Sequence, residues 1–499
     1  MNGISTLPRL SIEIAGARLT AEQGYCLEEA RIQQRLSAPS LCELKFSEHA
    51  SRESLPLLPG KTMRVSVGID PETLFVGELT AIEYEYDPSG GRKIYLRGYD
   101  LLNRLRKRQP VRTHAQVNLD ELARHLVADM GISVETKEGS LLWQRVIQYG
   151  QSDFDLLSEK AERCGQYFTL RGQVLSLLTL KGIGEPEKLV LGDSLFEARI
   201  EMNSIPACRA VFAAGWDPLR VESHNGGAKT ARAADAESSR ASSSSERALL
   251  NEVLQDDTEA EAIAQAELDL RYAQEVTLWG VAEGNPRLMP GTPIEVYGIA
   301  TQFEGRYVLT AVNHTIDASC GFASEIMTVP PLPSPRPAGA ETTLGIVTSV
   351  DDPEKLGRVQ ASLPAYGEIE TGWMTVLIAG AGAGKGIVAL PDVGDQVLVL
   401  FAGRDPAHGI VLGGLNGIQD PPDWGIDQGK VRRYSLLTRG GQKLQLDDTR
   451  NRVRIENRDG SYVELSPERV VLHAMSDLKI EAPGKAIVIK GQSIDFQRA

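Results

Sequence analysis

The sequence lacks the features of a disulfide-stabilised, zinc-binding or membrane-spanning protein. Its five cysteines are scattered and odd in number, and no two stand in a C-x-x-C pair, the spacing on which zinc sites commonly depend. The N-terminus has neither the basic start nor the apolar stretch of a secretory signal. Nowhere do about 18 apolar residues run together, as a membrane-spanning helix requires. We therefore expect folding in a reducing cytoplasm and export, if any, without a signal peptide.

Signatures of catalysis are equally scarce. The seven histidines include no H-E-x-x-H spacing, and no G-x-S-x-G elbow is present. Residues 379–386 superficially resemble a phosphate-binding loop, but Ala379 and Gly386 occupy positions that a Walker A motif fills with Gly and with Ser or Thr. His408 is expected in a surface turn and His473 on a solvent-facing strand position. We predict no catalytic, cofactor-binding or metal-binding residues, and no enzyme.

The net charge of −14 argues against nucleic acid as a partner, because such binding depends on basic residues that neutralise phosphates. One basic cluster, residues 104–108, interrupts the acidic balance. A solvated helix end or loop is the simpler interpretation, and an anionic partner is the alternative.

The chain of 499 residues is too long for a single hydrophobic core, since cores stop growing at roughly 250–300 residues. Residues 1–329 mix alternating strand patterns with helical ones, and Ser152 with Asp155 forms a weak capping box. Residues 217–246 have few large apolar side chains and are expected to form an exposed Ser-rich loop. The predicted elements are strands at 10–14, 63–67, 93–97, 294–297 and 307–312, and helices at 119–130, 152–164 and 258–273.

A proline-rich linker at residues 330–343 marks a domain boundary, because prolines hold the chain extended. Residues 344–417 are almost purely β in pattern and suit a small barrel of the OB kind. Residues 418–440 form a connector. The strands predicted for the barrel are residues 345–350, 357–361, 373–377, 386–390, 396–401 and 409–412.

Residues 441–499 alternate apolar and mostly polar positions with unusual persistence. Side chains alternate across a strand, so each strand would have one apolar face. The predicted core positions are Leu444, Leu446, Val453, Ile455, Val463, Leu465, Val470, Leu472, Leu478, Ile480, Ile487, Ile489, Ile494 and Phe496.

No helix or second set of strands follows residue 441 to cover this apolar face. Fully burying one large aliphatic side chain is favourable by ~1.5–3 kcal/mol, so other copies of the chain are expected to cover it. Three sheets around a threefold axis would enclose a dry interior. The alternative is an ordinary β-sandwich half packed against the chain's own barrel.

Two regions carry a resemblance to known proteins. Residues 345–367 and 386–417 resemble the spike-base OB domain of VgrG proteins and contractile-phage spikes, and residues 148–177 resemble the hub of VgrG and phage late control protein D. The specific part is P-x-V-G-D-x-V-L-V followed by D-P-x-x-G-I-V-L-G-G-L-N. These motifs contain Pro391, Gly394, Asp395, Asp405, Pro406, Gly413, Gly414 and Asn416.

The resemblance implies a mainly β protein: an α+β hub of tail-tube-like barrels, an OB-fold barrel, and an intertwined triple-stranded β-prism or β-helix needle in a homotrimer. It implies a membrane-puncturing spike of a type VI secretion-like or phage tail-like injection system, assembled in the bacterial cytoplasm and delivered on firing. The implied partners are the tube protein, baseplate components, a PAAR-like tip protein and effectors, with only transient membrane contact. An envelope-degrading enzyme or a glycan-binding stalk, trimerised by the prism, stays open.

Overall fold

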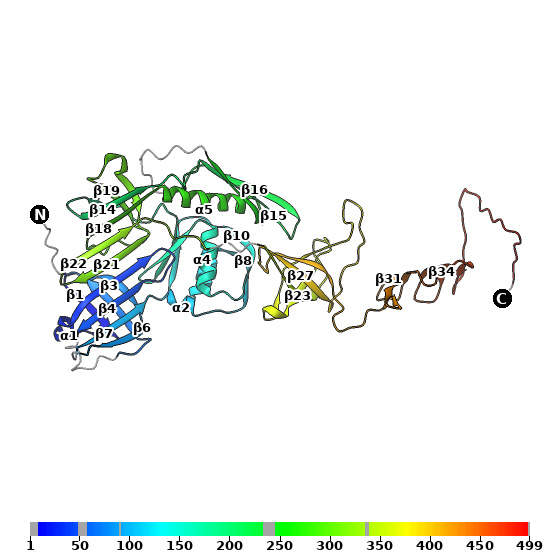
Figure 1. Ribbon diagram of the computed structural model, residues 1–499, viewed down its shortest axis with the longest axis horizontal. Coiled ribbons are helices and arrows are strands. Elements are labelled where there is room, and N and C mark those ends of the chain that lie inside the picture. Colours follow the sequence, from blue (N-terminus) through cyan, green and yellow to red (C-terminus); the bar gives the residue numbers. More distant parts are fainter. Residues whose placement is uncertain (1–7, 48–56, 89–90, 233–244, 335–338, 498–499) are drawn as a thin grey trace. The chain divides into compact units, whose positions relative to one another are not determined.

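The computed structural model describes residues 8–47, 57–88, 91–232, 245–334 and 339–497 (Figure 1). The chain divides into two compact units, Met1–Gly414 and Leu415–Ala499. Within the described residues, no helix has the length and apolar character needed to cross a membrane. Strands dominate both units, which confirms the mainly β fold class with an α+β N-terminal part.

An eleven-stranded sheet organises the first unit. Its middle joins distant parts of the chain, because β3 near the N-terminus pairs with β21 and places Arg31 opposite Thr315 (Figure 1). Ile32, Leu44 and Leu79 are fully buried in its core. In spatial order the strands are β14 (Leu195–Met202), β18 (Val276–Glu283), β22 (Gly321–Met327), β21 (Ala311–Asp317), β3 (Leu27–Arg35), β4 (Leu41–Ser47), β7 (Arg92–Tyr99), β6 (Glu72–Tyr86), β5 (Thr62–Val67), β1 (Leu10–Ile14) and β2 (Ala17–Arg18).

Four smaller sheets and the helices complete the hub. The Ser152 hydroxyl accepts a hydrogen bond from the Asp155 N–H at the start of α4, and the Asp155 carboxylate accepts one in return, which confirms the capping box. The helices are α1 (Ala21–Tyr25), α2 (Asn103–Arg106), α3 (Leu119–Val127), α4 (Asp153–Arg163) and α5 (Asp257–Glu275). The small sheets comprise β8 (Arg112–Asn118) with β10 (Leu142–Gln148), β9 (Ser133–Thr136) with β11 (Tyr167–Arg171) and β12 (Val174–Leu178), and β13 (Glu187–Val190) with β19 (Pro293–Tyr297) and β20 (Gly305–Val308).

Two sequence predictions for the hub were wrong in detail. The single strand predicted at 307–312 is two strands, since β20 ends at Val308 and β21 begins at Ala311. The predicted loop at 217–246 contains β16 (Glu222–Ala228), which pairs with β15 (Ala210–Asp217), itself paired with β17 (Glu246–Val253). Residues 233–244 of that loop lie outside the described residues.

Strand β16 escaped prediction because its packing contact is made by a glycine. A Cβ at Gly226 would lie 2.4 Å from the Glu261 nitrogen of α5, so the strand approaches the helix through bare backbone. Large apolar side chains, the usual sequence signal of a strand, have no room there.

The barrel is a six-stranded sheet in the order β25 (Ile369–Glu370), β24 (Gln360–Leu363), β23 (Ala340–Ser349), β27 (Gln396–Ala402), β28 (Gly409–Gly414) and β26 (Thr375–Val376). A 3-10 turn, η3 (Pro364–Tyr366), precedes β25, as η2 (Thr301–Phe303) precedes β20 in the hub. Val347, Val399, Phe401 and Val411 fill the interior. The prediction of a strand at residues 386–390 was wrong. Within the described residues, no neighbouring strand pairs with this stretch.

A five-stranded antiparallel meander forms the second unit, preceded by the short pair β29 (Ile426–Asp427) and β30 (Lys430–Val431). Its strands are β31 (Arg433–Leu437), β32 (Lys443–Asp447), β33 (Arg452–Glu456), β34 (Tyr462–Leu465) and β35 (Val470–His473). The sheet therefore begins within the residues predicted as a connector.

The strands predicted around Leu478/Ile480, Ile487/Ile489 and Ile494/Phe496 were wrong for a single chain. Described residues 474–497 contain no strand. An extended segment becomes a strand only when a neighbour supplies backbone hydrogen bonds, and the described part of this chain offers none.

Candidate functional site

The register of the meander aligns the predicted core residues in columns. Residues directly opposite on antiparallel strands project from the same face and contact each other. One column is Leu436, Leu444, Ile455, Val463 and Leu472, and the other is Tyr434, Leu446, Val453, Leu465 and Val470. We call these two columns the apolar face.

The described residues of its own unit leave the apolar face without cover. Of its predicted core residues, Val453 is half-buried, and the other seven are exposed by 36% at Val463 to 72% at Val470. The predicted core residues beyond the sheet are also exposed, up to 88% at Phe496. A surface of contiguous exposed aliphatic side chains is a marker of an interaction site.

The opposite face of the sheet is polar and better covered. Gln445 and Asp447 of β32 are 4% and 5% exposed. Asp423, from the segment before β29, accepts hydrogen bonds from Arg433, Ser435 and the Gln445 amide, the last at 3.0 Å. The chain thus covers its own polar face and leaves the apolar face open.

This polar network extends along the sheet. Arg452 Nη2 donates to Gln445 Oε1 at 3.2 Å, and Arg454 pairs with Glu464 and Glu456 at 3.0 Å each. The Arg454 guanidinium also lies 3.9 Å from the centroid of the Tyr462 ring. These contacts cross-link three successive strands, β32 to β34, which resists shear between them.

At the end of the network, His473 is exposed, and its ring stacks on Tyr462 with centroids 5.0 Å apart.

The network also lowers the pKa of two of its carboxylates. Hydrogen bonds from Arg433, Ser435 and Gln445 hold the pKa of Asp423 well below its usual range, although burial opposes this. The hydrogen bond from Arg454 lowers the pKa of Glu456 in the same way. Both carboxylates therefore stay charged and paired at neutral pH.

The first barrel motif, Pro391 to Asp395, forms a turn that closes the sheet. Gly394 adopts a φ of 89°, and its N–H donates to the Val347 carbonyl at 2.9 Å. A Cβ would strain this left-handed conformation. Asp395 Oδ2 accepts from the Asp392 N–H at 2.8 Å. Pro391 is half-buried at the start of the turn.

The second motif, Asp405 to His408, packs against the hub. Pro406 and Ala407 are buried, and Asp405 Oδ2 lies 3.3 Å from His408 Nδ1. Burial alone would raise the pKa of Asp405, but His408 and the charge of Lys160 on α4 hold it well below its usual range. Lys160 is itself 7% exposed and pairs with Glu159 at 2.8 Å.

Further contacts join barrel to hub around this turn. Arg145 Nη1 donates to the Glu370 carbonyl at 2.8 Å, and the Thr375 hydroxyl donates to the Leu219 carbonyl at 2.9 Å. The Tyr149 and Tyr366 rings lie 5.2 Å apart, edge to face. Sequence reasoning missed these residues, because the paired groups are separated by more than 150 positions.

The remaining motif residues end the barrel. Gly413 and Gly414 are the last residues of β28, and the Asn416 carbonyl accepts from the Gln419 N–H at 2.9 Å in the turn that follows.

The basic cluster at 104–108 is engaged by acidic neighbours. Arg104 pairs with Glu78, and Arg108 pairs with Asp129 at 2.7 Å and Asp153 at 3.0 Å. The Arg106 guanidinium lies over the Phe154 ring at 4.7 Å. These contacts favour the simpler interpretation, a helix end whose charges are compensated.

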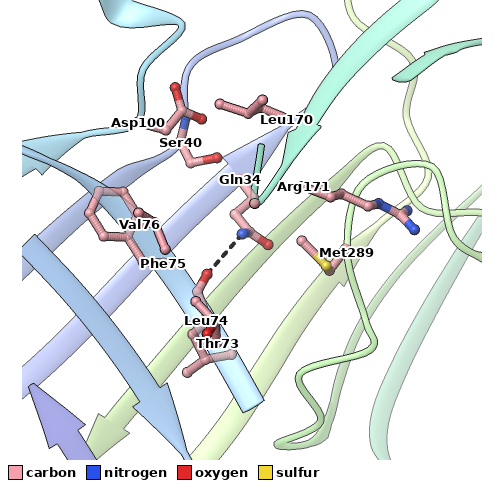
Figure 2. Close-up of a pocket in the computed structure, with 11 residues that line it drawn as sticks. Gln34, Ser40, Thr73, Leu74, Phe75, Val76, Asp100, Leu170, Arg171 and Met289 are labelled. Atoms are coloured by element: carbon pink, nitrogen blue, oxygen red, sulfur yellow. Dashed lines mark hydrogen bonds between the residues drawn. The ribbon is translucent and has the colours of Figure 1, made fainter. Parts of the chain in front are cut away.

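A cavity of about 160 Å³ lies in the hub, between the main sheet and the β11–β12 hairpin (Figure 2). Gln34 donates to the Leu74 carbonyl at 3.2 Å, and burial raises the pKa of nearby Asp100 to about 6. Asp100 is held by the backbone N–H groups of Ser40 and Leu102, so its role is to fix a turn. Within the described residues, no group of three or more His, Cys, Asp or Glu side chains could hold a metal ion.

Two family models match the chain. Residues 343–415 match the type VI secretion system/phage-baseplate injector OB domain. Residues 42–318, more than half of the chain, match the Alg8 N-terminal domain.

A curated relative is the type VI secretion system spike protein VgrG4b of Pseudomonas aeruginosa. It is 29% identical over 164 residues, which cover 31% of this chain and 19% of that protein. The match thus spans about a fifth of the relative's length.

Solved structures show the same fold. The E. coli c3393 protein, a type VI secretion component similar to the phage T4 tail proteins gp27 and gp5, has a TM-score of 0.56 at 14% identity, covering 81% of this chain and 99% of that one. The Francisella PdpA–VgrG complex gives a TM-score of 0.56 at 12% identity, covering 95% and 81%. The 43 kDa tail protein of prophage MuSo2 from Shewanella oneidensis gives 0.51 at 16% identity, covering 65% and 98%.

The barrel, the hub and the relatives agree with one another and with the motifs at residues 391–395 and 405–416. The chain therefore belongs to the VgrG and phage-baseplate hub-and-spike family and, through residues 42–318, to the Alg8 N-terminal domain family.

Proposed function

We propose that this chain is one subunit of a homotrimeric hub and spike at the tip of a contractile injection system. Its hub joins the tube and baseplate, and its C-terminal residues form a membrane-puncturing needle. Family membership supports the structural role. The observation that supports a trimer is the apolar face, whose side chains are exposed on a single chain.

The free energy available favours assembly. Each large aliphatic side chain that is fully buried contributes ~1.5–3 kcal/mol, and the two columns of all three chains together supply many such side chains against an entropy of association estimated at about 4–15 kcal/mol. A cyclic trimer places three apolar faces inward and three polar networks outward. Residues 474–497 then find backbone partners on neighbouring chains and form the strands that one chain cannot.

The proposed partners follow from the family. They are the tail-tube protein and baseplate components at the hub, and a PAAR-like tip protein or effector at the needle. The Francisella VgrG was solved in complex with PdpA, which supports a partner protein for such a spike. We also propose assembly in the bacterial cytoplasm and delivery with the particle on firing.

We propose that the role is mechanical rather than enzymatic. Stiffness and symmetry concentrate the force of sheath contraction on a narrow point, and the cross-linked polar network on the outer face supplies resistance to shear. Purified protein incubated with peptidoglycan should release no fragments. Turnover that a single carboxylate substitution abolishes would support an envelope-degrading enzyme instead.

Light scattering on the purified full chain tests the trimer. The expected mass is three times the 54.2 kDa of one chain, independent of dilution over a wide range. A stable, soluble monomer would overturn the proposal, because it would show that the apolar face needs no cover.

A further inference from the structure

The outside of the barrel is apolar where water would favour polar side chains. On β23, β27 and β28 the inward residues fill the core, as expected, but six of the outward residues are also aliphatic, next to the polar outward residues Thr342, Thr348 and Gln396. Strands that are apolar on both faces are typical of sheets covered on both sides. The aliphatic outward residues are Leu344, Ile346, Leu398, Leu400, Ile410 and Leu412, and we call the surface that they form the outer barrel face.

Exposure shows that the outer barrel face is only partly covered. Leu344 is 53% exposed and Ile346 is 38% exposed, whereas the other residues of the face are half-buried. The opposite pairs Leu344 with Leu398 and Leu400 with Ile410 make the surface continuous across three strands.

A second apolar element of the same domain is also without cover. Residues 378–391 form an arm with a turn in which Gly382 and Lys385 exchange backbone hydrogen bonds of 3.1 Å. Beyond the turn, Ile387 and Val388 are 63% and 72% exposed and pair with no strand. The sequence of this stretch is nonetheless strand-forming, which is why a strand was predicted there. Lys385 is the only charged residue in the arm.

We propose that in the assembled spike the arm of one chain lies on the outer barrel face of the next chain. The inference rests on the proposed trimer and names a second contact between its copies. The arm and the face are both aliphatic, and neither contains a carboxylate, so their contact would bury no unpaired negative charge.

The covalent link between the barrel and the second unit favours another copy of this chain as the partner that covers the outer barrel face. The barrel ends at Gly414, where the second unit begins. When three C-terminal sheets associate, the barrels attached to them are held at high effective concentration, so a weak apolar contact becomes occupied. A contact between two different surfaces is heterologous, and it closes into a ring when each copy is rotated by one third of a turn.

Cross-linking between differently tagged chains tests this contact. Two full-length variants, Val388→Cys and Leu344→Cys, are co-expressed in a Cys320→Ser background, which removes the exposed native thiol. Mild oxidation should give disulfide-linked pairs that carry both tags. As a control, Lys137→Cys, an exposed residue of the hub, replaces Leu344→Cys and should give no mixed pair.

The mass of the same samples separates the two proposals. A trimer without the mixed cross-link overturns the arm contact alone, whereas a monomer overturns the proposed function as well. One chain carrying both cysteines is the further control. If it closes a disulfide within itself and the mixed pair stays absent, the arm covers its own barrel and the inference fails.

A charge in the arm gives an independent measurement. Val388→Asp changes a residue that is 72% exposed in the single chain, so circular dichroism should show an unchanged fold. The concentration at which trimers dissociate should rise at least tenfold. An unchanged dissociation midpoint would contradict the contact.

Discussion

Gln445 and Leu446 are neighbours on β32, yet Gln445 is 4% exposed and Leu446 is 44% exposed. This is the reverse of the usual arrangement, in which the aliphatic residue is buried and the polar one faces water. Gln445 is buried because Asp423 and Arg452 hydrogen-bond to it. Leu446 is exposed because no described residue of its unit packs over its face. The proposed trimer would cover Leu446 and the rest of its column.

The two faces of the C-terminal residues should respond differently to charge. Ile489→Asp should prevent trimer formation, since it places three unpaired carboxylates in a dry interior, and Lys490→Asp should be tolerated. Both positions are exposed in one chain, so folding of the monomer does not decide the outcome. Light scattering checks the mass of each variant, and equal effects would contradict the assigned faces.

Residues 474–497 should gain backbone hydrogen bonds on assembly. Amide hydrogen exchange at Leu478 and Ile480 should be slow in the wild-type trimer and fast in Ile489→Asp. Mass spectrometry of peptides from this segment measures the difference. Fast exchange in a proven trimer would show that the segment stays without strands.

Asp423→Asn should weaken the second unit at neutral pH by about 1.5 kcal/mol, the value of a hydrogen bond to a charged group. The folded-state pKa of Asp423 is lowered, so its stabilisation is full above the ordinary value of about 4 and is lost as pH falls through the lowered pKa. The gap between wild type and variant should therefore narrow in strong acid.

Thermal unfolding across pH measures that gap. Asp459→Asn, a change at an exposed position in the turn between β33 and β34, is the matched control. A gap that widens as the pH falls would be inconsistent with a charged Asp423.

Lys160 and Asp405 should be energetically coupled, because the charge of each shifts the pKa of the other across the hub–barrel contact. Residues in one ionic network commonly show interaction energies of about 0.5–3 kcal/mol. In a double-mutant cycle, Lys160→Met and Asp405→Asn should together cost less than the sum of the two alone. Calorimetry of the barrel transition measures the three variants, and simple additivity would refute the coupling.

Alanine substitutions at two adjacent glycines of β16 should change the stability of the hub by very different amounts. Gly226→Ala brings a Cβ within 2.4 Å of the Glu261 nitrogen on α5 and should destabilise the hub by about 1–3 kcal/mol, as overpacking does. Gly227→Ala meets only the Val211 carbonyl oxygen at 3.4 Å and should be nearly neutral. Urea unfolding compares them, and similar midpoints would contradict the close approach of strand and helix.

Local signals predicted a large part of the fold. The capping box of α4 and the alternation of β32 to β35 depend on near neighbours in sequence, and the structure confirms both. Strand β16 was missed because its contact with α5 is made by Gly226, which gives no hydrophobic signal. Residues 386–390 were wrongly predicted as a strand, because a hydrophobic pattern does not show whether a neighbouring strand is present to pair with them.

The sequence by itself determined the apolar columns, since the period of a strand places every second residue on one face. It also identified the barrel motifs and the family. Only the tertiary structure decided that Asp423 covers the polar face and that Asp405 meets the charge of Lys160. Those contacts join residues far apart in the chain, and their partners are fixed by how the sheets and helices pack, which no local pattern encodes.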